Sequence, residues 1–158
     1  FDIIVGGKGA DTMNGGDDSA TFYQSETSSI PSSARVADGN TATSTVGLVF
    51  AQGVDVITDF ISGLQVLDTH TAVAAITTDA IVDKTALTNN TTYAIKGGYN
   101  TSTNTFTFSA NGTDLLYGTA DVVTAAGATQ GQLNGFDDDA VIMLGAVANF
   151  TNTTIQGP

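Results

Sequence analysis

The first residues of the chain repeat with a period of nine. Beginning at Gly6, the sequence Gly-Gly-Lys-Gly-Ala-Asp-Thr-Met-Asn places glycines, one aspartate and one large apolar residue in a fixed order. The same order continues on both sides, because nine residues separate Asp2 from Asp11 and Met13 from Phe22. A short repeat of this kind is typical of a coil in which each unit contributes one turn and one strand. The spacing therefore predicts a stack of parallel strands at the start of the chain.

The residue types of each unit suit the two parts of such a coil. The glycine-rich part forms the turn, because glycine adopts positive φ and lets main-chain carbonyls approach a cation. The remaining residues form a short strand whose apolar side chain points inward. Two units make one coil of a parallel β-roll. Calcium takes about six to eight hard oxygen ligands, so carboxylates and carbonyls stacked from successive coils suit this ion.

This pattern resembles the RTX family of calcium-binding repeats, found in proteins that bacteria export by type I secretion. The resemblance covers about the first 23 residues, and the last turn of that segment is degenerate. In the family, a calcium ion lies between turns two units apart and is held by main-chain carbonyls and turn aspartates. The resemblance therefore implies a short roll that binds Ca²⁺ at its turns.

Carried over residue by residue, the family pattern implies three sets of cation contacts. The first set comprises Gly7, Gly9 and Asp11, with its other half at Gln24, Glu26 and Ser29, where the glycines are lost. The second set joins Asp2 to the carbonyls of Gly15 and Asp17, with Asp18 substituting for the aspartate that Ala20 replaces. The third set faces a coil before Phe1 and comprises Gly6, Lys8 and Asp11.

Two other interpretations compete for the same residues. A strand at 1–5 followed by Gly7-x-Gly9 also resembles the start of a dinucleotide-binding motif, which opens directly into a helix. The residues that follow are rich in helix breakers, and Thr12 stands where that motif has Gly or Ala. An ordinary glycine-rich hairpin is the third interpretation. We favour the calcium interpretation because it accounts for the in-phase neighbours.

Composition agrees with a cation-binding role. The chain has 158 residues, 16 Asp and Glu against 4 Lys and Arg, and a net charge of −12. Apart from Glu26 the acidic residues are aspartates, the shorter carboxylate that suits turns and tight oxygen cages. Such a chain should repel nucleic acid and anionic membranes, so divalent cations are the expected partners. The alternative is that most of these charges only keep the protein in solution.

The remaining global features bear on the source of stability, on membrane spans and on the extent of the chain. The chain has no cysteine, so bound metal replaces disulfides as a possible source of stability. No stretch approaches about 18 consecutive apolar residues, so no membrane span is expected. Because Phe1 begins inside a repeat and no leader is visible, the chain is expected to be the tail of a longer protein.

The chain after Tyr23 is predicted to be β-rich, giving a mainly all-β protein. The expected strands lie at 46–51, 54–61, 92–97, 104–109, 114–117 and 140–145. Short helices are permitted at 72–88 and 119–134. The predicted organisation is a β-roll at 1–25, a loop or linker at 26–45, and a capping and secretion-signal domain at 46–158, which would close the open end of the roll.

A second informative segment runs from Val54 to Asp68. It is similar to the D-x-I-x-D-F-x-x-G-x-D-x-[IL]-D stretch that follows the repeats in many type I secreted proteins, with Gln65 where Asp is usual. In a strand, Asp55, Ile57 and Asp59 would share one face. Asp55 and Asp59 are therefore candidates either to bind a cation or to cap and orient the turn.

No catalytic constellation is visible, and we expect that the chain is not an enzyme. Its one histidine is His70, which excludes an H-E-x-x-H zinc site, and cysteine nucleophiles are impossible. Two functions remain. The first is a calcium-triggered folding and type I secretion module. The second is a surface-layer or adhesin-like protein that assembles with copies of itself. Both imply a secreted or bacterial cell-surface location.

Overall fold

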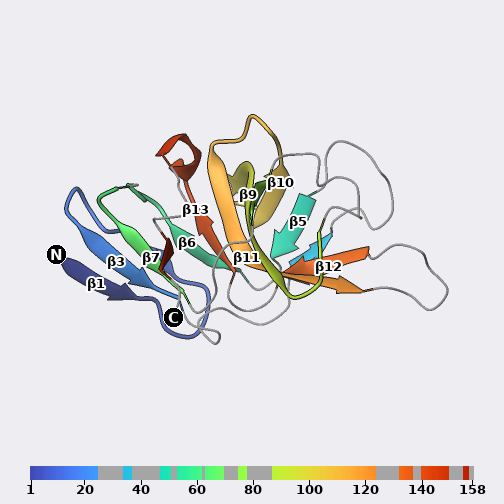
Figure 1. Cartoon of the computed structure of the whole chain (residues 1–158), viewed down its shortest axis with the longest axis horizontal. Helices are drawn as coiled ribbons and strands as arrows, with labels where there is room; N and C mark the ends of the chain where they lie inside the picture. Colours follow the sequence, from blue (N-terminus) through green and yellow to red (C-terminus); the bar gives the residue numbers. More distant parts are fainter. Residues whose placement is uncertain are drawn as a thin grey trace.

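The computed structural model describes residues 1–24, 34–36, 47–50, 53–61, 63–69, 75–77, 87–123, 132–136, 140–149 and 155–156. These residues form strands joined by turns, together with one short 3₁₀ helix, η2 (Ala146–Asn149). The predicted all-β class is confirmed. Figure 1 shows two regions side by side, a stack of short strands at the N-terminal end and longer antiparallel strands beyond it. No helix in the described part is long and apolar enough to cross a membrane.

The short strands form two parallel ladders. One ladder has the order β1-β3-β7-β14, built from β1 (Asp2–Val5), β3 (Ala20–Tyr23), β7 (Val66–Asp68) and β14 (Ile155–Gln156). The other has the order β2-β6-β13, built from β2 (Thr12–Met13), β6 (Asp55–Ile57) and β13 (Val141–Met143). Because the chain alternates between the ladders, its path describes the coils of a β-roll (Figure 1).

The register of the ladders shows how far the roll extends. Asp2 pairs with Ala20, 18 residues later, which is the spacing of two nonapeptides. Met13 pairs with Ile57 and Phe22 pairs with Leu67, across 44 and 45 residues. The parallel stack therefore continues beyond residue 25, with the intervening chain leaving the stack after β3 and returning at β6.

The inward apolar positions of the repeat form the core of the roll. Met13 and Phe22 are buried together with their ladder partners Ile57 and Leu67, and Ile4 packs against the same cluster. The Phe22 ring lies 6.1 Å from that of Phe60, between centroids. Burying such a side chain completely contributes about 1.5–3 kcal/mol. The inward apolar ladder is therefore the main source of cohesion between coils.

The antiparallel region shares strands with the roll. From β13 the sheet continues through β11 (Asp114–Val123), β9 (Thr91–Asn100), β10 (Thr105–Phe108), β5 (Gly47–Phe50) and β4 (Ala34–Val36). Two further strands pair beside it, β12 (Gln132–Phe136) with β11 and β8 (Ala75–Thr77) with β9. Alternate residues of the shared strands point to opposite faces, so Ile57 joins the roll core while Val56 joins a second core.

The strand predictions are confirmed, whereas the predicted helices are corrected where the structure describes them. Each expected strand segment contains an observed strand, and Phe106 and Phe108 share a buried face as their alternation predicted. Within 72–88 and 119–134, however, the described residues 87–88 lie in neither a helix nor a strand, and residues 75–77, 119–123 and 132–134 lie in strands. Pairing with β9 and β11 decides their conformation, because threonine- and valine-rich segments have no strong helical preference. Most of the predicted linker at 26–45 lies outside the described residues, although β4 falls within it.

Candidate cation-binding turns

The turn between β1 and β2 has the backbone that its glycines predicted. Gly7 and Gly9 have φ of 91° and 122°, values that residues with a Cβ rarely adopt. Apart from the neighbouring residues in the chain, no heavy atom of the described residues comes within 4 Å of a Cβ built at either position, so it is the conformation that requires glycine there. The turn is therefore open on the side of these two residues.

Asp11 ends this turn with its side chain folded back over Gly6. A Cβ added to Gly6 would lie 3.1 Å from Asp11 Oδ2. That oxygen is buried and has no hydrogen-bond partner in the part of the chain that the structure describes. A buried polar atom without a partner destabilises a protein by about 1–3 kcal/mol, and more when it is charged. A cation would stabilise this carboxylate, so the first turn fits a hard divalent ion.

Asp55 occupies the same position in the next coil. The pairing of Thr12 with Val56 places Asp11 and Asp55 side by side. The Asp11 main-chain N–H donates to Asp55 Oδ1 at 2.9 Å, and Gln24 Nε2 donates to Asp55 Oδ2 at 2.9 Å. Asp55 is completely buried. Its carboxylate orients the first turn through hydrogen bonds, which is one of the two roles considered for it.

Asp59 holds the turn between β2 and β3 in a similar way. Its Oδ1 accepts a hydrogen bond from Gly15 N at 2.9 Å, and its Oδ2 accepts one from Gly16 N at 2.6 Å. Gln65 reaches the same turn, donating from Nε2 to Gly16 O at 2.9 Å and to Asp18 O at 3.4 Å. Side chains from a later turn therefore bind both the donors and the acceptors of this one.

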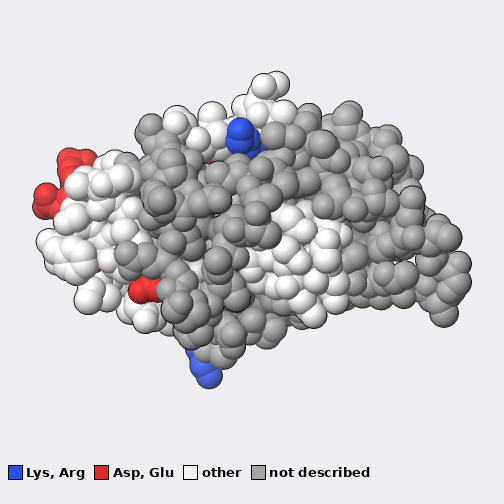
Figure 2. All heavy atoms as spheres, viewed as in Figure 1, with Lys and Arg blue, Asp and Glu red and all other residues white. Residues whose placement is uncertain are grey.

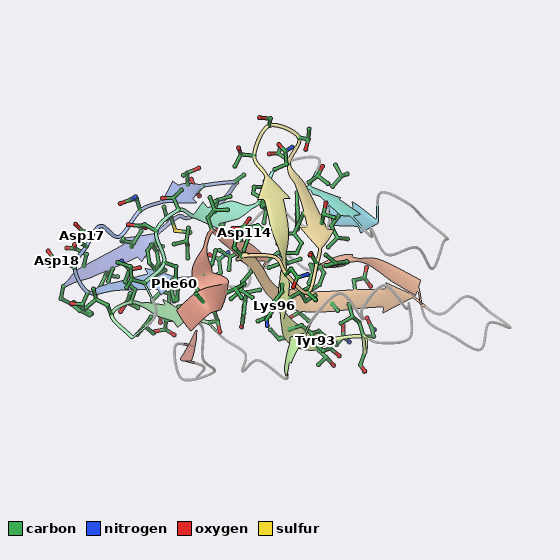
Figure 3. The ribbon with its side chains drawn as sticks, turned by 90° about the horizontal axis from the view of Figure 1, so that it is seen from above. Asp17, Asp18, Phe60, Tyr93, Lys96 and Asp114 are labelled. Atoms are coloured by element: carbon green, nitrogen blue, oxygen red, sulfur yellow. The ribbon has the colours of Figure 1, made fainter. Side chains whose placement is uncertain are left out.

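The other candidate side chains remain on the surface. Asp2, Lys8, Asp17 and Asp18 are exposed, and Figure 3 shows Asp17 and Asp18 at the outer end of the roll. Acidic atoms gather at this end of the face drawn in Figure 2. The structure thus brings Asp11 and Asp55 together, and Asp59 to Gly15 and Gly16, but keeps Asp17 and Asp18 at the tip. Glu26 and Ser29, which the family pattern placed opposite Asp11, lie outside the described residues.

Side chains alone do not build a metal cage in the described part of the chain. No group of three or more His, Cys, Asp or Glu side chains is arranged there to hold a metal. An ion at the first turn would draw most of its ligands from main-chain carbonyls, as calcium readily does. Among the described residues, the lining of a groove of about 450 Å³ between this turn and the tip of the β9–β10 hairpin is uncharged and offers no carboxylate to an ion.

The structure reveals two turns that the sequence analysis did not recognise as members of the repeat. Gly53 and Gly63 have φ of 86° and 83° and precede Asp55 and Gln65 by two residues, as Gly9 precedes Asp11. In each case a buried apolar residue follows two positions later. The shorter signal Gly-x-[Asp/Gln]-x-apolar would have identified them, because it omits the leading glycines that these turns lack.

Comparison with known proteins does not assign the chain to a family. It matches no protein-family model, and no curated protein sequence matches it significantly. The evidence for function therefore comes from the residues of the turns themselves.

Proposed function

We propose that this chain is a calcium-binding module of a secreted bacterial protein, in which Ca²⁺ bound at the first turn couples ion binding to folding. One observation carries the proposal: the Asp11 carboxylate has a buried oxygen without a partner in the described chain, within a turn whose Gly7 and Gly9 adopt positive φ. The RTX-like repeat that contains this turn supports calcium as the ion. Export by a type I system and an extracellular location are proposed from the same resemblance.

Different residues of the chain would supply the charge, the neutral ligands and the positioning of the proposed site. Asp11 supplies the negative charge, while the carbonyls of Gly7 and Gly9, or of Gly6 and Lys8 on the other side, supply neutral oxygens. Asp55 holds the Asp11 backbone in place by accepting its N–H. The bound ion would supply positive charge to a chain of net charge −12, which opposes compaction by self-repulsion.

Calcium titration with two matched variants tests this proposal. In calorimetry we expect the wild-type chain to bind Ca²⁺ at about 10⁻⁴–10⁻³ M, the range of extracellular calcium sites. Asp11→Asn should weaken binding about tenfold or more because it removes the cage's formal charge. Asp17→Asn removes the same charge from an exposed side chain nearby and keeps its carbonyl, so it should bind like the wild type. Equal weakening by both variants would indicate diffuse charge and contradict a defined site.

Self-assembly is a second candidate function, favoured in the chain as given by the exposed strand β1. This strand lies at the edge of its sheet, and Phe1, Ile3 and Val5 are 80, 69 and 63% exposed. An edge strand with exposed apolar side chains is a template for pairing with another chain. Light scattering with calcium and then with chelator should show reversible assembly that Ile3→Lys abolishes. A monodisperse monomer under both conditions would contradict self-assembly and leave the folding module as the only proposed function.

A further inference from the structure

We infer that the face of the second turn that carries the Gly16 and Asp18 carbonyls is closed by the side chain of Gln65 in place of a cation. The inference rests on the proposed function for the identity of the ion. The hydrogen-bonded junction itself depends only on the contacts of Gln65 and Asp59, which are independent of any ion.

Gln65 stands at a repeat position that carries a carboxylate elsewhere in the roll. Asp2 pairs with Ala20, and the pairing of Thr21 with Val66 places Gln65 beside Ala20 in the following coil. Asp2, Ala20 and Gln65 therefore occupy equivalent positions in three successive coils. The third coil has an amide where the first has a carboxylate. The amide can donate hydrogen bonds at this position, whereas an ionised carboxylate can only accept them.

The Gln65 amide occupies the point on which the carbonyls of the second turn converge. Its Nε2 donates to Gly16 O at 2.9 Å and to Asp18 O at 3.4 Å, and its Oε1 accepts from Ile61 N at 2.8 Å. Two carbonyl oxygens of one turn that approach a single centre are suited to a cation, but the two protons of an NH₂ group satisfy them equally well. The accepted bond from Ile61 fixes which end of the amide faces the carbonyls.

Packing leaves no room for an ion beside this amide. Gln65 is 1% exposed. A Cβ added to Gly15 would lie 2.7 Å from Gln65 Nε2 and 2.9 Å from the ring of Phe22, so the glycine main chain is pressed against both side chains. A cation would have to displace the amide, which would then lose three hydrogen bonds.

Asp59 completes the closure from the other direction. Its two carboxylate oxygens accept the N–H groups of Gly15 and Gly16, which are adjacent in the chain. The turn between β6 and β7 thus provides an acceptor for the donors of the second turn and a donor for its carbonyls. The first turn differs, because Asp11 Oδ2 has no such donor among the described residues.

Hydrogen exchange of the wild-type chain tests the closure directly. In chelator, the amides of Gly15 and Gly16 should exchange slowly, and adding millimolar Ca²⁺ should change their exchange far less than that of the amides in the first turn. Protection of Gly15 and Gly16 that appears only with Ca²⁺ would overturn the inference. If Ca²⁺ affects neither turn while Gly15 and Gly16 stay protected, the calcium function fails but the closure stands.

A pair of substitutions at Gln65 then tests what the amide replaces. Gln65→Glu keeps the side-chain length but replaces the amide donor with an oxygen, which joins the carbonyl oxygens of Gly16 and Asp18. The variant should therefore have a lower melting temperature than the wild type in chelator, and Ca²⁺ should restore it. Calorimetry should show one additional bound ion. Gln65→Met also removes the donor but offers no oxygen, so its loss of melting temperature should not be recovered. Equal responses of the two variants to Ca²⁺ would overturn the inference, as would unchanged melting of Gln65→Glu in chelator.

Discussion

At the scale of single residues, equivalent repeat positions have different chemistry. Asp11 and Asp55 are neighbours in register, yet Asp55 accepts hydrogen bonds on both oxygens whereas Asp11 Oδ2 is buried without a partner in the described chain. The difference arises because the Asp11 N–H and the Gln24 amide both point toward Asp55. Register therefore determines where a carboxylate lies, and the neighbouring donors determine what it does.

The first prediction concerns the buried carboxylate of Asp55. Asp55→Ala should lower the free energy of unfolding by about 2–5 kcal/mol, because it leaves the Asp11 N–H and the Gln24 amide without this acceptor. Denaturant unfolding in saturating calcium measures the loss. Asp17→Asn, which removes an exposed charge, is the control and should change stability little. An Asp55→Ala chain as stable as the wild type would show that the acceptor role is unimportant.

A second prediction separates backbone conformation from packing at Gly9. Gly9→Ala should destabilise the protein by about 1–3 kcal/mol, because φ of 122° is strained for any residue with a Cβ. The matched control is Gly98→Ala. Apart from chain neighbours, neither glycine has a heavy atom of the described residues within 4 Å of an added Cβ, and Gly98 is not among the positive-φ glycines. Thermal unfolding of the two variants compares them directly. Equal melting temperatures would contradict the conformational explanation.

At the scale of elements, the β9–β10 hairpin is tied to the roll through one carboxylate. Asp114 Oδ2 accepts from Tyr99 N at 2.8 Å, and Asp114 Oδ1 accepts from Gly145 N at 2.8 Å, just after β13. Figure 3 shows Asp114 between the roll and the antiparallel region. The hydroxyl of Tyr99 also donates to Asn104 Oδ1 at 3.2 Å, across the hairpin turn. The hairpin is thereby positioned against the third coil.

Tyr99 gives this hairpin a predictable response to alkaline pH. Burial raises the pKa of the Tyr99 phenol above the ordinary value of 10.0, because desolvation disfavours the charged form. In the unfolded chain the phenol ionises near pH 10, so this contribution to stability is complete below pH 10 and is lost as pH rises through the higher folded pKa. Tyr99→Phe should therefore lose less stability than the wild type between pH 9 and pH 11. Parallel pH profiles for the two proteins would contradict this.

At the scale of the whole molecule, the acidic charge and the shared sheet act against each other. A net charge of −12 favours expansion, whereas β6, β13 and β11 belong to both cores and hold the two regions together. Cations reduce the electrostatic self-repulsion without changing the packing of the shared strands. The exposed acidic end of the roll is where their effect should be greatest.

Salt should therefore stabilise the calcium-free protein in a nonspecific way. In chelator, raising NaCl from 10 mM to 500 mM should increase the melting temperature because the Debye length shortens from about 30 Å to a few Å. Each kcal/mol gained corresponds to about 2–4 °C for a chain of this size. Calcium at matched ionic strength should add a further increase that Asp11→Asn removes. A melting temperature that is insensitive to NaCl would show that self-repulsion is negligible.

Features that depend on a single repeat unit can be read from the sequence alone. Positive φ at Gly7 and Gly9 and the inward direction of Met13 and Phe22 follow from local backbone conformation and side-chain alternation. The strand at 105–108 and the first part of the strand at 114–123 are likewise recognisable from their local sequence pattern. These features do not depend on residues that are distant in the sequence.

Which coils stack, and what closes their turns, depends on tertiary contacts. Met13 meets Ile57 and Val141 meets Asp55, pairings that cross residues outside the stack and so have no period in the sequence. Gln65 looked like a missing ligand because residue type alone does not reveal that two carbonyls of an earlier turn converge on its amide. Hydrogen bonding between coils depends on positions in space, and those are set by the packing of the apolar ladder beneath the turns.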